Sequence, residues 1–189
     1  MTLSALGIFS AAGAGGGAAF ASDYELIETQ ILGTATPSIT FSSLSTYSST
    51  YKHLQIRAAV GHTNAGSGNA LYFRLNGDTG TNYSYHEMGG NGSSVYSTGA
   101  ANTNSPLAVA LRQPLSNTAF GGGVIDFLDA YSTTKNKTVR SLNGAQSTDS
   151  IIILSSGVRL NTEAISSITL FVPSGNISVN SRFSIYGIK

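Results

Sequence analysis

The chain of 189 residues contains no cysteine, and only 10% of its residues are charged. The absence of cysteine excludes disulfide bonds and thiolate metal sites, and it leaves the redox compartment open. A formal net charge of +1 offers no excess of Lys and Arg, which binding to a nucleic-acid backbone or an anionic membrane would need. Composition therefore argues against nucleic acid and against a membrane surface as partners.

No segment shows the apolar periodicity of an amphipathic helix. After Asp23, short runs rich in Val, Ile, Leu, Tyr, Phe and Thr alternate with clusters of Gly, Asn, Ser and Pro, which is typical of strands and turns. Leu54 and Ile56 alternate with polar residues at the period of two of a half-buried strand. The predicted strands are 24–32, 38–42, 52–60, 69–75, 83–88, 107–112, 120–131, 136–142, 150–158, 164–172 and 181–188.

Turn signals between these runs define the expected fold. Asn76-Gly77 is a strong signal for a two-residue hairpin, because a type I′ turn needs positive φ at both positions. The run 150–154 is apolar on both faces, so we expect it to be central or covered by a neighbouring subunit. Segments 96–105 and 113–118 lack apolar periodicity, and we expect surface loops there. The spacing of the strands predicts an all-β fold, an antiparallel β-sandwich of jelly-roll type, over residues 23–189.

Residues 1–22 form a separate segment that carries no charge and consists mostly of Gly, Ala and Ser. Such a chain loses much backbone entropy on ordering and buries little surface, so it becomes fixed only where other surfaces hold it. We expect an extended N-terminal arm that anchors the chain to a partner. Its largest side chains apart from Met1 and Phe20 would supply the buried contacts, and its glycines would allow a bend or a close backbone approach. These residues are Leu3, Leu6, Ile8 and Phe9, with Gly15, Gly16 and Gly17.

The arm has two further interpretations. It resembles a secretion signal in its apolar stretch and in Ala19-Phe20-Ala21, but it has no positively charged start and its apolar part is broken by glycines. As a membrane span, residues 3–21 are uncharged, but Gly and Ala provide little transfer energy. We therefore favour an anchoring arm over a cleaved or inserted segment.

Several stretches of the body match a known group of proteins. They are 51–57, 71–86, 123–131, 135–142 and 183–189, and the most distinctive parts are Asn76-Gly77-Asp78 and the ending Tyr186-Gly187-Ile188-Lys189. In these stretches the chain resembles a family of small virion proteins of tailed bacteriophages, including phages of cyanobacteria and other aquatic bacteria.

This resemblance implies a β-sandwich located on a phage particle, as a fibre or spike subunit of the tail or neck, or alternatively as a capsid decoration protein. It implies a homotrimer that contacts another virion protein, such as the portal, neck, tail or major capsid protein. It implies no catalysis, and it identifies no catalytic residue and no cofactor.

Two segments have the composition of metal or catalytic sites. The turn 76–82 places oxygen ligands at near-alternate positions, as a Ca²⁺ loop would, but Asp78 is its single carboxylate and a hairpin already explains Asn-Gly. Asp126 and Asp129 could form the acid pair of a glycosidase, but residues three apart on a strand point to opposite faces. We expect them instead to pair with Lys135, Lys137 or Arg140. The three histidines show no paired spacing, so we expect no metal site.

Tyr83, Tyr85 and Tyr96 flank a segment rich in Asn and Gly. Tyrosine is common where proteins bind sugars or each other, so these three residues are candidates for contact with a host-surface glycan, although ordinary cross-strand packing is the favoured explanation. They also motivate a function of another class, a secreted carbohydrate-binding module. The favoured hypothesis remains a non-enzymatic virion subunit.

Overall fold

The structure is a computed structural model, and it describes residues 22–64, 70–105, 107–109, 120–145 and 150–189. These residues form two antiparallel sheets and one short 3-10 helix, η1 (Leu44–Tyr47). The strands are β1 (Tyr24–Ile31), β2 (Ser38–Phe41), β3 (His53–Val60), β4 (Leu71–Leu75), β5 (Tyr83–Gly90), β6 (Val95–Thr103), β7 (Leu107–Val109), β8 (Gly121–Leu128), β9 (Lys137–Ala145), β10 (Ile151–Arg159), β11 (Ile168–Phe171) and β12 (Arg182–Ile188).

Eight of these strands have the pairing of a jelly roll. Strands β1, β12, β3 and β8 lie side by side in one sheet, and β2, β11, β4 and β7 form the opposing sheet. Within this set of eight, the chain passes from one sheet to the other at every step except that from β4 to β7, which are neighbours in the same sheet. This arrangement confirms the predicted all-β sandwich and its jelly-roll type.

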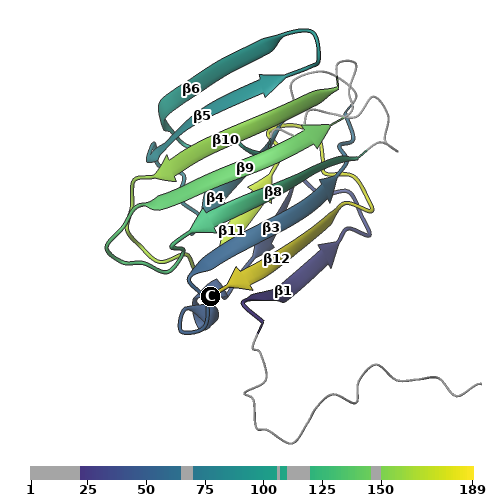
Figure 1. Cartoon of the computed structure of the whole chain (residues 1–189). Coiled ribbons are helices and arrows are strands. Elements are labelled where there is room, and N and C mark those ends of the chain that lie inside the picture. The colour runs from purple at the N-terminus through teal and green to yellow at the C-terminus, as the bar shows by residue number, and fades with distance from the viewer. Residues whose placement is uncertain (1–21, 65–69, 106, 110–119, 146–149) are drawn as a thin grey trace, which may run out of the picture.

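The remaining four strands enlarge one sheet. The hairpin β5–β6 is inserted between β4 and β7, and the hairpin β9–β10 between β8 and β11. The two hairpins pair with each other through β10 and β5, with Ile152 opposite Gly90 and Arg159 opposite Tyr83. The result is an eight-stranded sheet in the order β1-β12-β3-β8-β9-β10-β5-β6, which extends well beyond the strands of the jelly roll (Figure 1).

The core lies between the two sheets and is built from every second side chain along the strands, those that point toward the opposing sheet. Phe73 of β4 packs edge-on against Phe127 of β8, with ring centroids 5.5 Å apart, and against Tyr83 of β5 at 6.2 Å. Tyr83 is fully buried, and its hydroxyl accepts a hydrogen bond from the Leu75 amide. A smaller apolar cluster of Ala145, Ile151 and Ile153 lies under the inserted hairpins.

Three predictions about local structure need correction or refinement. Asn76 and Gly77 form a turn, but the hairpin expected there is wrong, because β4 and β5 belong to different sheets and do not pair with each other. The segment 96–105 was expected to be a loop, but residues up to Thr103 belong to β6, which β5 pairs with along its length. Most residues of β6 are small rather than β-branched, so the strand depends on its pairing with β5 and not on intrinsic β-propensity. In β10, Ile151 and Ile153 are buried, whereas Ile152 and Leu154 face outward and are exposed. The segment 113–118 lies outside the described residues.

Candidate functional site

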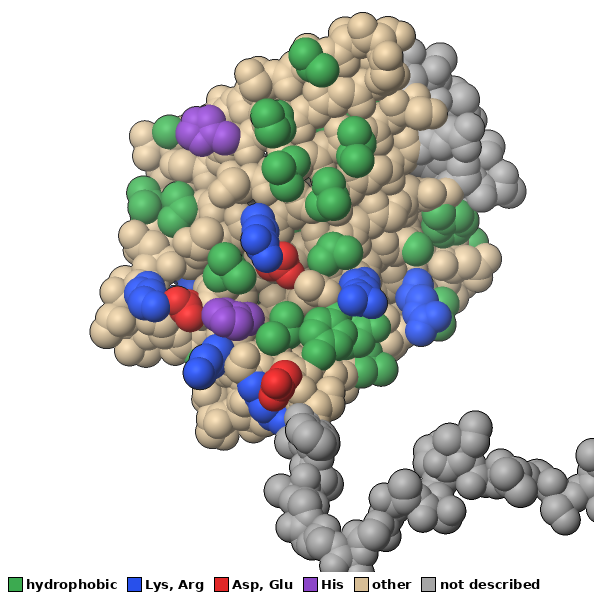
Figure 2. All heavy atoms as spheres, in the orientation of Figure 1, with side chains coloured by type: hydrophobic (Ala, Val, Ile, Leu, Met, Phe, Trp, Pro, Cys, Tyr) green, Lys and Arg blue, Asp and Glu red, His purple; other side chains and the backbone are tan. Residues whose placement is uncertain are grey.

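The outer face of the eight-stranded sheet has an apolar region over the inserted hairpins. Because side chains alternate along each strand, β5, β6, β9 and β10 all turn large apolar side chains outward. Val95 is 89% exposed, and the other four side chains are between 48% and 59% exposed: Met88, Leu142, Ile152 and Leu154. In Figure 2, green side chains gather over the half of the face that these hairpins form.

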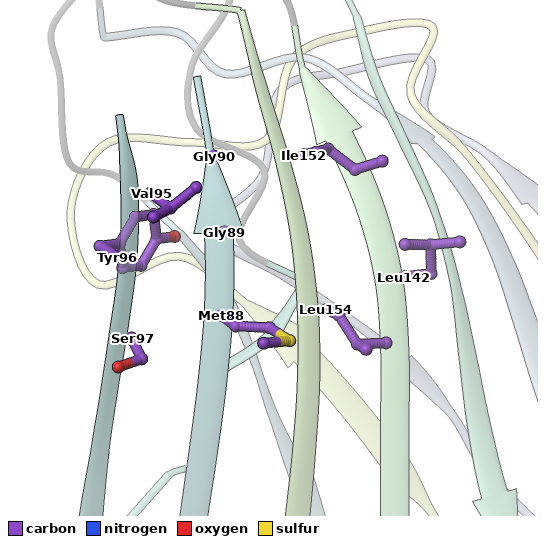
Figure 3. A pocket seen from close by; sticks show the side chains of 9 residues that line it. All are labelled: Met88, Gly89, Gly90, Val95, Tyr96, Ser97, Leu142, Ile152 and Leu154. Carbon is purple, nitrogen blue, oxygen red and sulfur yellow. The ribbon is translucent and has the colours of Figure 1, made fainter. Parts of the chain in front are cut away.

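These five residues surround a shallow depression with a volume of about 620 Å³, which we call the apolar hollow. Figure 3 shows Met88 and Leu154 side by side at one end of it and Ile152 near the other. Its lining contains no charged side chain. The full lining is Met88, Gly89, Gly90, Val95, Tyr96, Ser97, Leu142, Ile152 and Leu154.

The register of the strands explains the shape of the hollow. One cross-strand row consists of Val124, Leu142, Leu154 and Met88, which are direct partners across β8, β9, β10 and β5. The next row contains Ile152 with a glycine on either side, Gly144 on β9 and Gly90 on β5. A ridge of large side chains therefore borders a row in which Ile152 stands between two residues without side chains.

The backbone does not require glycine at Gly90 or Gly144. A Cβ on Gly144 would have Ile151 O at 3.4 Å as its nearest neighbour, and a Cβ on Gly90 would have Ser94 O at 3.4 Å, both ordinary van der Waals contacts. Neither residue has a positive φ. Gly187, by contrast, could not carry a Cβ, since it would lie 2.2 Å from the Tyr51 ring. The glycines beside Ile152 therefore shape the surface rather than the chain path.

The other half of the same outer face is polar and internally paired. Tyr24 donates a hydrogen bond from its hydroxyl to Gln55 Oε1, and the Gln55 amide donates to Asp126 Oδ1 at 2.7 Å. Arg140 Nε donates to the other Asp126 oxygen at 2.8 Å. The Arg57 guanidinium lies 5.2 Å from the centre of the Tyr24 ring. The apolar hollow thus contrasts with a hydrogen-bonded, charged region on the same sheet.

The two edges of the large sheet differ in the same way. Edge strand β1 carries Glu25 and Glu28 and has an irregularity between Leu26 and Glu28, both of which hinder pairing with another strand. Edge strand β6 contains no charged residue and no proline over Val95–Thr103. Since Val95 belongs both to β6 and to the hollow, the uncharged edge continues directly into the apolar surface.

In the turn 76–82, which was considered as a cation loop, the single carboxylate binds an arginine of the same chain. Asp78 Oδ2 accepts a hydrogen bond from Arg159 Nε at 2.8 Å, and Asp78 also accepts from the Gly80 amide and the Asn82 side chain. Burial by itself would raise the pKa of Asp78, but these hydrogen bonds outweigh it and hold the pKa below the ordinary value. The guanidinium supplies the positive charge that a cation would bring.

The two aspartates weighed as catalytic acids are both in ion pairs. Asp126 binds Arg140, and Asp129 binds Lys135 with 2.6 Å between Nζ and Oδ2, as the sequence predicted. The Lys135 hydrogen bond lowers the pKa of Asp129. Asp129 has a φ of 47° in the turn after β8, so it is not a strand residue. Within the described ranges, no group of three His, Asp or Glu side chains could hold a metal ion.

Lys137 does not pair with either aspartate. Its side chain is fully buried, and Nζ donates to three backbone carbonyls, those of Ser132, Lys135 and Thr162. Desolvation lowers the pKa of its ammonium group. A lysine in a strand run gives no sequence signal for this role, because the three carbonyls come from two separate loops.

The three tyrosines proposed for glycan contact do not form an outward patch. Tyr83 is fully buried, so its assignment to receptor contact is wrong. Tyr85 is half-buried and follows Tyr83 on the same side of β5, and burial raises the pKa of its hydroxyl. Tyr96 is half-buried against the Ala145, Ile151 and Ile153 cluster. Packing explains all three positions.

The predicted anchoring residues of the arm, from Leu3 to Gly17, lie outside the described residues. The arm joins the body at Ser22, whose carbonyl accepts a hydrogen bond from Lys189 Nζ at 2.8 Å, next to edge strand β1. The described part of the chain contains no helix of the length and apolarity needed to cross a membrane. Comparison of this chain with protein-family models and with curated proteins found no match.

Proposed function

We propose that this chain is a non-enzymatic structural subunit of a tailed-phage particle. In this proposal it is a fibre or spike subunit that assembles as a homotrimer, and residues 1–22 anchor it in the tail, neck or capsid. As an alternative, the same subunit would be a decoration protein on the capsid.

One observation carries the proposal, the uncovered apolar hollow on the outer face. An exposed group of five large apolar side chains marks an interaction surface, because monomeric soluble proteins rarely leave such side chains together in water. It lies on inserted hairpins, outside the jelly-roll strands. The occupant that we propose for it is part of a second copy of this chain, since neither the hollow nor edge strand β6 presents a charge that would repel an identical subunit.

The positions of the hollow and the arm favour a cyclic oligomer. The arm leaves the body beside β1, at one edge of the large sheet, and the hollow adjoins β6 at the other edge. Different surfaces at opposite edges suit a head-to-tail contact, which closes into a ring when the rotation between subunits allows it.

The test compares full-length protein with Leu154→Asp, which places a charge in the hollow. Leu160→Asp is the matched control, because Leu160 is exposed to a similar degree, 52% against 48%, outside the hollow. We expect the wild type and the control to have the mass of a trimer in light scattering and to be incorporated into particles, and Leu154→Asp to fail in both. A wild-type chain that is monomeric at all concentrations and missing from purified particles would refute the proposal.

A further inference from the structure

The apolar hollow contains depressions that could accept the side chains of an extended peptide. Ile152 stands between Gly144 and Gly90, so depressions flank it, and Leu142, Leu154 and Met88 form a wall along one side. A second depression, of about 500 Å³ and also bordered by Leu142 and Ile152, continues the hollow toward β8 over Gly122 and Gly144, and Arg57 lies at its border. Together they form a trough that crosses several strands.

We propose that this trough binds the arm segment Leu3–Phe9 of a neighbouring copy of the chain. The inference rests on the proposed function and names the partner of its apolar surface. The segment contains four large apolar side chains within seven residues and no charge, which matches a trough whose apolar hollow is also uncharged. Small residues follow it, so the remainder of the arm can pass closely over the neighbour's sheet.

The length of the arm is sufficient for this contact. Ser22 lies thirteen positions after Phe9, and an extended chain over that stretch spans roughly 43 Å. Seven strand spacings separate β1 from β6, which amounts to roughly 34 Å. The extended arm is thus longer than the large sheet is wide. Starting beside β1, it can therefore reach the trough of a neighbouring subunit whose β6 edge lies next to that β1.

Occupancy by a neighbour is favoured over folding back onto the same body. To reach its own hollow, the arm would have to cross the half of the outer face that contains Asp126 and Arg140, where Asp126 already accepts hydrogen bonds from Gln55 and Arg140. An uncharged Gly and Ala segment gains little there. In a head-to-tail ring the arm begins at the subunit boundary and meets the apolar half of the next sheet first.

The absence of cysteine makes a direct cross-linking test possible. Full-length Phe9→Cys and full-length Ile152→Cys are mixed, reduced, and oxidised together, and heterodimers are measured on a non-reducing gel and identified by mass spectrometry. Phe9→Cys mixed with Leu160→Cys is the control, because Leu160 has similar exposure outside the trough. We expect at least a tenfold higher heterodimer yield with Ile152→Cys than with Leu160→Cys.

A second variant tests the shape of the trough without removing a packed side chain. Gly144→Leu fills the depression beside Ile152, and the Cβ that it adds meets nothing closer than Ile151 O at 3.4 Å. Introduced into the Ile152→Cys chain, it should reduce the heterodimer yield to the level of the control while the circular dichroism spectrum stays unchanged.

The outcomes separate this inference from the proposed function. Equal yields at Ile152 and Leu160 in a protein that is still trimeric would overturn the arm contact and leave the virion-subunit proposal standing. A disulfide formed within one chain in the double variant Phe9→Cys/Ile152→Cys, at concentrations where chains do not associate, would overturn the exchange between neighbours. A cross-link in the mixed experiment, lost on Gly144→Leu, supports the inference.

Discussion

The Arg159 guanidinium lies 2.8 Å from the Asp78 carboxylate, and the arginine side chain is only 3% exposed. This ion pair joins the turn after β4 to the end of β10. A second carboxylate, on Glu163, accepts from Arg159 Nη2 at 3.3 Å. The inserted hairpin β9–β10 is thus fastened to the jelly roll by a buried charge.

Replacing Asp78 with Asn should destabilise the protein strongly. The variant keeps the size of the side chain but leaves a buried guanidinium without its closest counter-charge, and breaking such a pair costs about 3 kcal/mol or more. Urea unfolding followed by circular dichroism measures the change. Glu163→Gln is the control, because Glu163 is largely exposed, and it should cost much less. Equal effects of the two variants would contradict this account of the pair.

The same pair predicts a loss of stability in acid. Because the folded-state pKa of Asp78 is lower than its ordinary value of 3.8, the ionised carboxylate stabilises the fold above that value. The contribution should decline as the pH falls below about 4 and through the folded-state pKa. Unfolding free energies of the wild type and Asp78→Asn should therefore converge between pH 5 and roughly pH 2. A difference that is constant over this range would refute the linkage.

Lys137→Met should lower stability although methionine is apolar and of similar length. The ammonium group of Lys137 binds the carbonyls of Ser132, Lys135 and Thr162, and its removal leaves buried acceptors without a donor, at about 1–3 kcal/mol. Thermal unfolding measures the effect. Lys135→Met is the control, since Lys135 is exposed and forms only a surface ion pair. A stabilised Lys137→Met protein would show that desolvation of the lysine outweighs its hydrogen bonds.

Two glycine substitutions should have opposite outcomes. Gly187→Ala forces a Cβ to within 2.2 Å of the Tyr51 ring, so we expect a loss of about 1–3 kcal/mol from overpacking. Gly144→Ala meets only ordinary contacts, and alanine loses less backbone entropy than glycine, so stability should stay equal or rise slightly. Denaturation midpoints of the two purified variants compare these effects directly. A destabilised Gly144→Ala would show that Gly144 is needed by the backbone.

The sequence predicted most strands because their alternation and turns are local signals. Leu54 and Ile56 are buried on one side of β3. Asn76 and Gly77 both have positive φ, at 54° and 68°, as a type I′ turn requires, but the turn leads from one sheet to the other instead of closing a hairpin. Strand β6 was missed because its residues are small and polar, and its pairing with β5 is a tertiary effect. The sandwich was predictable from local patterns, whereas the enlargement of one sheet by two hairpins was not.

The candidate site was only partly predictable. The run 150–154 was expected to be central or covered by a neighbour, and two of its four apolar side chains, Ile152 and Leu154, do face outward without cover within the subunit. The hollow itself depends on the register that sets Ile152 between Gly144 and Gly90, residues from three strands. No pattern along a single segment contains that information. Tyr83 was misassigned for a similar reason, because its position under Phe73 is decided by the opposing sheet.

The two hairpins that carry the hollow are inserted along the chain between jelly-roll strands, and they change none of the pairings among those strands. The ends of these hairpins can therefore vary in length without disturbing the pairing of the eight jelly-roll strands. On the strands of the hairpins, outward side chains that shape the surface alternate with inward side chains that belong to the core, such as Tyr83 and Val139, so substitutions at the outward positions alone can change the surface and leave the core intact.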